Sequence, residues 1–394
     1  MSQEPFIQKL TLRNFRSIRN ETVTFANPLF LVGRNGSGKS NFVDALAFIS
    51  ECMSGTLQSA AERRGGLGRI GYFPHDWQFQ VSLRADFQIG IDYPRKGFYA
   101  FTLKVTSGIK YEVTREQCKL NSGDNKISWF DRRGSQIESS VAGIKFQASP
   151  SSLVMPLISG IQDFTSVYQS LAEMRVYNID PGSISGVQNQ EDEELLKSNG
   201  SNIGSVIQRL WMQEDQLRRV DEVLQSVVPG VTPIPPDFAG GKALLYFEQE
   251  WPKTKQVFEA AVMSTGTLYA LGLVVAALQE PAPSIIAIEE PELNIHPGAL
   301  EAISDIIKIA SQRTQVVVTT HSPDLLDAKW LQPENLRVVE WEKGATHISE
   351  LGEAPIEALK RHLMGAGELL RANALDAAAP KPEDVSDPFQ ETLA

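Results

Sequence analysis

Apolar and polar residues alternate near the start of the chain in a way that predicts β-strands. FIQKLTLRNF, residues 6–15, alternates apolar and polar positions, which is typical of a strand with one buried face. NPLFLVG, residues 27–33, is a short apolar run that ends in glycine and predicts a buried strand. A glycine-rich loop follows, and NFVDALAFISECM then carries apolar residues at helical spacing. The chain therefore begins as strand, turn, strand, buried strand and helix.

The middle of the chain changes from a strand pattern to a helical one. Residues 76–118 alternate and are rich in turn residues, so they predict an antiparallel sheet. Residues 119–150 are polar and contain Gly and Ser, which leaves a further hairpin and a loop as alternatives. From 151 to 228 the spacing is mostly helical, interrupted by NIDPGSISGVQNQEDEE, which we expect to be an exposed loop. No heptad pattern persists there for the repeats that a long coiled coil requires.

The last part of the chain alternates strand and helix patterns after a Pro- and Gly-rich connection at 227–241. We expect strands at 242–249, 284–289 and 314–320, and helices at 257–279 and 298–311. Short helices follow residue 351, and we expect the Pro/Ala/acid tail 378–394 to be loose. These patterns predict an α/β fold with a mixed sheet, an antiparallel β subdomain and a helical lobe, divided at 1–62, 63–240, 241–350 and 351–394.

The composition is ordinary for a globular protein, with 394 residues, 42% of them hydrophobic and 22% charged. The most apolar stretch, residues 268–278, is far shorter than the ~20 residues of a membrane-spanning helix, so we expect no membrane segment. The opening MSQEPFIQKL shows no signal-peptide pattern. Cys52 and Cys118 form no CxxC spacing and suit a reducing compartment, so we expect a cytoplasmic protein.

The formal net charge of −11 bears on possible partners. Proteins that neutralise many phosphates usually carry an excess of basic residues. Contact with DNA would therefore need a local basic patch, the groove of an assembled dimer or a partner subunit. Two arginine pairs are candidates for phosphate contact, although such pairs more often form a solvated face: Arg63 with Arg64, and Arg132 with Arg133.

The glycine-rich segment GRNGSGKS fits the phosphate-loop pattern G-x-x-x-x-G-K-[ST] and stands between a buried strand and a helix. Its glycines let backbone N–H groups surround phosphate oxygens, and the helix N-terminus adds partial positive charge. We expect Lys39 to reach the β- and γ-phosphates and the Ser40 hydroxyl to ligate Mg²⁺. The predicted cofactors are therefore ATP and Mg²⁺, and the loop residues assigned to them are Gly33, Arg34, Asn35, Gly36, Ser37, Gly38, Lys39, Ser40 and Asn41.

A second candidate element is IIAIEEPELNIHP, residues 285–297, in which an apolar strand ends in two glutamates. In a phosphate-loop fold, an acid at the end of a neighbouring strand helps to hold Mg²⁺. We predict Glu289 for this role and Glu290 as the general base or water-positioning residue. A solvated acidic turn is the plainer alternative. A zinc site is a weaker one, because it needs about three ligands and only His296 stands nearby, without an HExxH pattern.

Two further segments could complete the site. In MSTGTL, residues 263–268, Ser264 can cap the following helix and Gly266 permits close backbone approach, which suits a phosphate. A capped core helix explains that segment equally well. His321 follows the strand TQVVVTT and would lie near the γ-phosphate. A strand-end histidine bonded to the backbone is the alternative there.

The order of GRNGSGKS, MSTGTL, IIAIEEPELNIHP and VVVTTHSPD resembles that of the ABC-type ATPase heads of SMC-like, RecF-like and OLD-type proteins. KLTLRNFRSIRN resembles their opening strand and turn, and the likeness covers roughly residues 5–50 and 240–330. It implies a phosphate-loop ATPase fold with Walker A at Gly33–Ser40, Walker B at Glu289 and Glu290, signature residues Ser264 and Gly266, a D-loop at PELNIHP and a switch histidine at His321.

The resemblance also implies a quaternary structure. In such heads the signature of one subunit closes over the nucleotide of another, which implies a head-to-tail homodimer around two ATP. The first Walker B acid is glutamate, as in OLD-like heads, and the signature lacks LSGGQ. The Q-loop residue stays open between Gln78 and Gln80. Arg16 and Ser17 would approach the base of the nucleotide or the signature.

Two features of the relatives are missing from this sequence. It has no long coiled coil, and about 70 residues follow His321, too few for a Toprim nuclease domain. The resemblance therefore implies an ATP-driven dimer switch whose nuclease or effector is a separate subunit, in DNA repair or phage defence by association with the family. A nucleotide-sensing module with little turnover is the alternative, and a transporter ATPase subunit is disfavoured by the middle region and Walker B.

Overall fold

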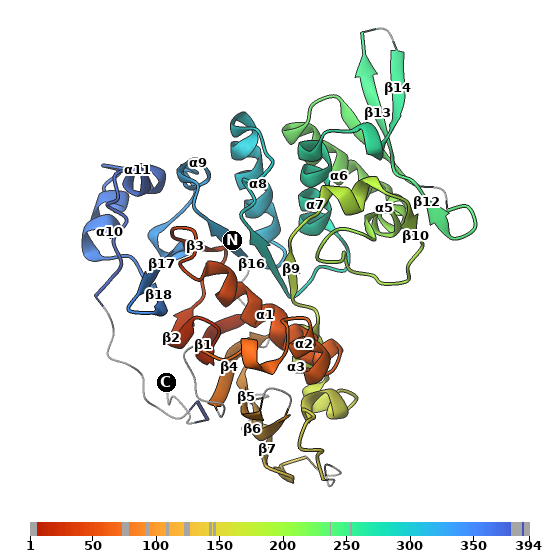
Figure 1. Ribbon diagram of the computed structural model, residues 1–394. Helices are drawn as coiled ribbons and strands as arrows, with labels where there is room; N and C mark the ends of the chain where they lie inside the picture. The colour runs from red at the N-terminus through yellow and green to blue at the C-terminus, as the bar shows by residue number, and fades with distance from the viewer. Residues whose placement is uncertain are drawn as a thin grey trace. The chain divides into compact units, whose positions relative to one another are not determined.

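The computed structural model describes residues 6–72, 79–90, 94–107, 110–121, 127–141, 144, 147–236, 238–252, 254–379 and 388–389. The chain divides into two compact units, and each is described by itself. The amino-terminal unit comprises Glu4–Met174, Pro333–Glu357 and Leu375–Ala394, and the central unit comprises Met1–Gln3, Arg175–Gln332 and Ala358–Ala374. Figure 1 shows the course of the chain. The four-part division predicted from the sequence pattern stays a prediction.

A seven-stranded sheet in the order β2-β1-β4-β5-β6-β7-β8 dominates the amino-terminal unit. Every neighbouring pair in it is antiparallel. The antiparallel sheet predicted at 76–118 is therefore confirmed over its described residues, and a hairpin rather than a loop follows it. The strands are β1 (Ile7–Phe15), β2 (Ile18–Thr24), β4 (Phe79–Ile89), β5 (Arg95–Ser107), β6 (Lys110–Asn121), β7 (Ile127–Arg133) and β8 (Gln136–Ser139).

The phosphate-loop segment of this unit lies between a buried strand and a long helix, as predicted. β3 (Leu29–Val32) is buried at every position, and α1 (Lys39–Ser54) begins at the lysine of the loop. β3 pairs in parallel with β17 (Leu336–Glu342), which turns back into the antiparallel β18 (Ala345–Ser349). No element was expected at 336–349 from the sequence, so this hairpin is a finding of the structure.

Three parallel strands form the centre of the other unit, with β15 between β16 and β9. β15 (Ile285–Glu289) and β16 (Gln315–Thr320) occur where strands were predicted, and their register sets Glu289 beside Thr319. β9 (Arg175–Tyr177) was not expected, because three residues are too few to show a strand period. The helix before β15 is α7 (Thr265–Leu278), and the helix after it is α8 (Leu300–Ser311).

The helix predicted at 257–279 is wrong at its start. β14 (Thr254–Glu259) pairs with β13 (Tyr246–Trp251), which also pairs with β11 (Val231–Ile234). A 3-10 turn at Ala260–Val262 then precedes α7. Val and Phe suit the strand, and the Ser264 cap fixes the beginning of the helix. Figure 1 shows β13 and β14 as a hairpin.

The helical region predicted at 151–228 is confirmed by α3 (Gln162–Ala172), α5 (Ile203–Trp211) and α6 (Glu214–Val227). Its expected loop contains a short helix, α4 (Pro181–Ser185), and β10 (Gln188–Asn189), which pairs with β12 (Lys242–Ala243). The other described helices are α2 (Leu57–Glu62), α9 (Pro323–Leu326), α10 (Glu353–Lys360), α11 (Ala366–Arg371) and 3-10 turns at Leu67–Arg69, Met155–Ile158, Pro297–Ala299 and Pro333–Asn335. Among the described helices, none is long and apolar enough to cross a membrane.

One described part of the tail is packed rather than loose. Phe389 is 8% exposed, and the Arg115 guanidinium lies 4.1 Å from the centre of its ring. The backbone carbonyl of Pro388 accepts a hydrogen bond from Arg84 at 2.8 Å. The prediction of a loose tail is therefore wrong for these two residues, because an aromatic ring gains from burial and from a cation over its face. The rest of the tail beyond residue 379 lies outside the described residues.

Both cysteines belong to the core of the amino-terminal unit. Cys52 lies in α1 and Cys118 in β6, and both side chains are buried as free thiols. Burial raises the pKa of both thiols above its ordinary value, because a thiolate loses its hydration there. Neither cysteine is therefore placed to bind a ligand from solution.

A buried ion pair joins two strands of the antiparallel sheet. Glu116 of β6 and Arg132 of β7 are both fully buried, with 3.7 Å between a guanidinium nitrogen and a carboxylate oxygen. The Glu116 carboxylate also accepts hydrogen bonds from the Tyr99 hydroxyl and from two backbone N–H groups, those of Val154 and Met155. The Arg132 guanidinium donates to three backbone carbonyls, those of Gly134, Ser149 and Ser152. Arg132 is therefore unavailable for the phosphate contact considered above.

Replacing Arg132 should destabilise the protein far more than replacing its neighbour. Arg132→Leu leaves a buried carboxylate without its cation and three carbonyls without a donor, so we expect a loss of about 3–5 kcal/mol in the free energy of unfolding. Chemical denaturation would measure it. Arg133→Leu is the matched control, because its side chain is 72% exposed and its pair with Asp131 should contribute less than about 1 kcal/mol. Equal losses in the two variants would contradict a structural role for the buried pair.

Candidate functional site

The phosphate loop closes around its own lysine, Lys39. Lys39 is 5% exposed, and its ammonium donates hydrogen bonds to the backbone carbonyls of Gly33 at 2.7 Å and Arg34 at 3.2 Å. Gly36 and Gly38 have φ values of 78° and 105°, which residues with a side chain rarely adopt. The loop therefore closes on its own lysine.

The hairpin β17–β18 packs so closely on the loop that two of its glycines have no room for a side chain. A Cβ atom on Gly33 would lie 2.2 Å from the carbonyl oxygen of Val339 in β17. A Cβ atom on Gly38 would lie 1.9 Å from the hydroxyl oxygen of Thr346 in β18. Gly36, by contrast, faces open space. Packing thus requires glycine at two positions, and backbone conformation requires it at Gly36 and Gly38.

A directed chain of hydrogen bonds holds the loop to the hairpin and to the turn after β1. The Asn41 amide donates to the Ser17 hydroxyl at 2.6 Å, and Ser17 lies 2.7 Å from the Thr346 hydroxyl. Thr346 in turn donates to the backbone carbonyl of Ser37 at 2.9 Å. The consistent direction runs from amide to hydroxyl to hydroxyl to carbonyl, since each hydroxyl has one proton to donate.

Thr346 is a site residue that the sequence did not reveal. It stands in a segment with no predicted element, and no motif marks it. The turn residue Ser17 is hydrogen-bonded to Asn41 and lies next to the Thr346 hydroxyl, and its approach to the nucleotide base or the signature stays a prediction. The one available signal was weak: ATHIS, residues 345–349, contains the β-branched residues Thr346 and Ile348, which suit a strand.

The arginines near the loop are engaged by acids of α1 and have limited freedom. Arg16 and Arg64 both bind Asp44, and Arg64 also binds Glu51 at 2.8 Å. The Arg64 side chain is 4% exposed, whereas that of Arg63 is 70% exposed. Of this candidate basic pair, only Arg63 therefore presents its charge to solvent.

The acidic segment of the central unit turns sharply where β15 ends. Glu289 is the last residue of β15, and Glu290 follows with a φ of 47°, in the left-handed region that costs a non-glycine residue energy. The Glu290 N–H donates to the Thr319 carbonyl at 2.9 Å, which anchors the turn to β16. Strained backbone of this kind is concentrated at functional sites.

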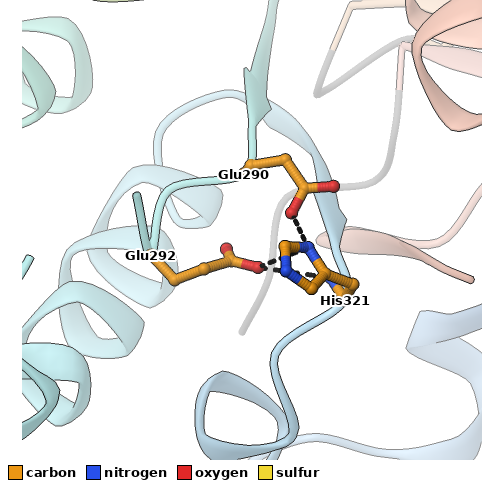
Figure 2. Close-up of side chains that lie close together, drawn as sticks. All are labelled: Glu290, Glu292 and His321. Carbon is orange, nitrogen blue, oxygen red and sulfur yellow. Dashed lines mark hydrogen bonds and ion pairs between the residues drawn. The ribbon is translucent and has the colours of Figure 1, made fainter. Parts of the chain in front are cut away.

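Glu290, Glu292 and His321 form one cluster, shown in Figure 2. The Nδ1 atom of His321 is hydrogen-bonded to the Glu290 carboxylate and lies 3.6 Å from Glu292. Glu292 accepts hydrogen bonds from the Thr320 hydroxyl at 2.6 Å and from the His321 N–H at 3.2 Å. The structure thus brings the predicted residues Glu290 and His321 together and adds Glu292, a residue of the segment PELNIHP that was predicted to be the D-loop.

The three side chains of this cluster differ in their access to water. Glu292 is 9% exposed, Glu290 18% and His321 43%. Burial raises the pKa of the Glu292 carboxyl above its ordinary value, and the nearby Glu290 acts in the same direction. His321 is therefore the most solvent-exposed side chain of the cluster, and Glu292 is the most buried.

The predicted signature residues lie at the beginning of α7. The Ser264 hydroxyl accepts a hydrogen bond from the Thr267 N–H at 3.1 Å, which is the expected cap. A Cβ atom on Gly266 would lie 2.8 Å from the carbonyl oxygen of Asn294, so the close backbone approach is also present. Both observations fit a capped core helix as well as a phosphate site, and the signature role stays a prediction.

Two other candidates can be placed. His296 caps a 3-10 turn by accepting a hydrogen bond from the Gly298 N–H at 3.1 Å, and it is not part of the cluster around His321. Gln80 lies in β4, where its carbonyl accepts a hydrogen bond from Asn14, and Gln78 falls outside the described residues. No Q-loop assignment follows from these positions.

The predicted site residues therefore fall into two groups that are each well defined. The amino-terminal unit holds the whole phosphate loop, Gly33–Asn41, around Lys39. The central unit holds Glu289, Glu290 and His321 at the ends of β15 and β16, together with the α7 cap. That the two groups act together on one nucleotide stays a prediction.

Comparison with known proteins gives this geometry a family context. Residues 9–226, more than half of the chain, match a family model described as "AAA domain". Residues 172–327 match a second model, described as "AAA domain, putative AbiEii toxin, Type IV TA system". No curated protein matches the chain.

Solved structures of SMC heads share the fold. An SmcHead bound to the C-winged helix domain of ScpA has 18% identity and a TM-score of 0.54, over 89% of this chain and 99% of that chain. A Pyrococcus furiosus Smc head with an extended coiled coil, bound to the C-terminal domain of ScpA, has 16% identity and a TM-score of 0.55, over 91% of this chain and 100% of that chain. At these identities the likeness concerns the fold alone.

Removing the Thr346 hydroxyl should loosen the phosphate loop. Thr346→Val keeps the shape of the side chain but breaks the link between Ser17 and the Ser37 carbonyl, so we expect about tenfold weaker nucleotide binding. Titration with a fluorescent ATP analogue would measure it. Thr346→Ser keeps the hydroxyl and should bind within about threefold of the unaltered protein. Unchanged affinity in the valine variant would refute a positioning role for this hydroxyl.

Proposed function

Because the chain belongs to the AAA-domain family and has the fold of an SMC-like ATPase head, we propose that it binds Mg·ATP and hydrolyses it. The predicted α/β fold of an ABC-type phosphate-loop head is thereby confirmed. The observation that carries the proposal is the phosphate loop itself. Its lysine, its left-handed glycines and the start of α1 together form a cradle for phosphate oxygens.

Ser40 and Glu289 are the ligands that we propose for the magnesium ion that accompanies ATP. Mg²⁺ prefers oxygen ligands and is commonly held by a hydroxyl, a carboxylate and the phosphates. Ser40 at the first turn of α1 and Glu289 at the end of β15 supply such oxygens. The ion, when bound, would neutralise charge on the β- and γ-phosphates.

We assign the hydrolytic step to Glu290 with His321. A carboxylate next to the γ-phosphate can orient the attacking water and accept its proton. Glu290 leaves β15 at a strained turn, and the hydrogen bond to the His321 ring fixes the direction of its carboxylate. Lys39 is assigned to the charge on the transferring phosphate.

The active form in this proposal is a head-to-tail dimer. Ser264 and Gly266 at the beginning of α7 would meet the γ-phosphate bound by another copy, so that ATP closes the pair and hydrolysis opens it. The similar SMC heads were solved with ScpA domains bound, which supports a separate effector for this chain. We propose DNA repair or phage defence as the setting. A nucleotide-sensing module with little turnover is the second candidate, and the exposed His321 allows a partner to control the site.

Glu290→Gln should slow ATP turnover by about 10²–10⁴-fold while leaving ATP binding intact. The amide keeps the size of the side chain but cannot accept the proton of the attacking water. Phosphate release would measure turnover, and light scattering with ATP would detect the trapped dimer. Lys39→Ala is the companion variant, because it should lose ATP binding itself. Unchanged turnover in Glu290→Gln would remove Glu290 from the role of base.

If DNA triggers the switch, adding DNA to the purified protein should raise ATP hydrolysis several-fold. The net charge of −11 makes the effect depend on local positive charge, and added salt should therefore weaken it. Phosphate release with single- and double-stranded DNA would measure the response. A flat response to both would favour a protein partner as the trigger and would reject DNA sensing.

A further inference from the structure

The cluster of Glu290, Glu292 and His321 has the composition of a metal site as well as of a hydrolytic one. It combines one imidazole nitrogen with two carboxylates, and the three possible ligand atoms lie within 4.8 Å of one another. They come from two strand ends, because Glu290 and Glu292 follow β15 and His321 follows β16. Figure 2 shows one oxygen of each carboxylate directed toward His321.

One atom of the cluster is unsatisfied. The Oε1 atom of Glu292 accepts two hydrogen bonds, from the Thr320 hydroxyl and the His321 N–H. Its Oε2 atom is buried and has no hydrogen-bond partner among the described residues. The side chain as a whole is 91% buried, given its 9% exposure. A buried carboxylate oxygen without a donor is costly, and a cation bound by both oxygens of Glu292 would remove that cost.

The donor set selects the class of ion. An all-oxygen set suits Mg²⁺ and Ca²⁺, whereas a histidine nitrogen with carboxylates suits Zn²⁺ and other divalent transition metals. Three protein ligands with one open position are common at such centres. The Nδ1 atom of His321 is the ligand candidate, because it faces both carboxylates.

We propose that Glu290, Glu292 and His321 bind one divalent transition-metal ion, such as Zn²⁺, in the nucleotide-free protein. The site is distinct from the magnesium ligands assigned above, Ser40 and Glu289. Glu292 is held in place by its two hydrogen bonds, so little ordering is needed there on binding. His321, with 43% of its side chain exposed, gives the ion a way in from solvent.

Metal binding would also regulate the activity, and this part rests on the proposed function. An ion bound to Glu290 and His321 occupies the lone pairs that hydrolysis needs. Zinc should therefore lower ATP turnover reversibly, and a chelator should restore it.

The test is zinc binding to the nucleotide-free protein, followed by competition with a chromophoric chelator. We expect one zinc ion per chain, with affinity reduced at least about tenfold by Glu292→Gln and by His321→Gln. His296→Gln is the matched control, because His296 is nearby in sequence but outside the cluster, and Glu301→Gln controls for the loss of an exposed acid. Co²⁺ substitution would give a second readout through its visible absorption, which reports coordination directly.

Two outcomes would overturn the proposal. Unchanged zinc affinity in Glu292→Gln or His321→Gln would do so, and so would equal loss in His296→Gln. Failure of the proposed function would give a different result, because the chain would then bind zinc without hydrolysing ATP under any condition. Turnover that ignores zinc, in a protein that binds it at this cluster, would reject only the regulatory part.

Discussion

The constraint on which the rest of the structure depends is the close contact between the phosphate loop and the hairpin β17–β18. A phosphate loop must keep its N–H groups turned inward, and its own residues are too flexible to maintain that shape alone. Here the Val339 carbonyl and the Thr346 hydroxyl occupy the space in which side chains at Gly33 and Gly38 would lie. The chain of hydrogen bonds that runs from Asn41 through Ser17 and Thr346 to the Ser37 carbonyl fixes the orientation of that contact. Segments more than 300 positions apart in the sequence therefore define one loop.

In the central unit the corresponding constraint is Glu292. Its carboxylate joins the end of β16 to the segment after β15 through hydrogen bonds to Thr320 and His321. The strained turn at Glu290 further limits the positions that this segment can adopt. The cost of burying this carboxylate has to be offset, because an unpaired acidic oxygen is unfavourable in a dry environment.

The sequence predicted those parts of the fold that carry a clear apolar run, a helical spacing of apolar residues or a strong local motif. The phosphate loop was located from its motif, the strands at 285–289 and 315–320 from their short apolar runs, and the helix α8 from its apolar periodicity. The hairpin β17–β18 was missed because its residues show only a weak strand pattern, and β9 was missed because it has only three residues. Arg132 and Arg133 looked alike, and only the fold distinguishes the buried one from the exposed one. Thr346 and Glu292 were missed as site residues for the same reason, because their importance comes from tertiary contacts.

The burial of both cysteines has a practical consequence for studies of movement. Cys52 and Cys118 are the only two cysteines of the chain, and their thiols are shielded from reagents as long as the core stays folded. A single cysteine introduced at an exposed position would thus be the one thiol that a maleimide or spin label reaches. The protein can be labelled at one chosen point in each unit without first removing its natural thiols, so distance measurements can test whether a nucleotide changes the separation of the two labels.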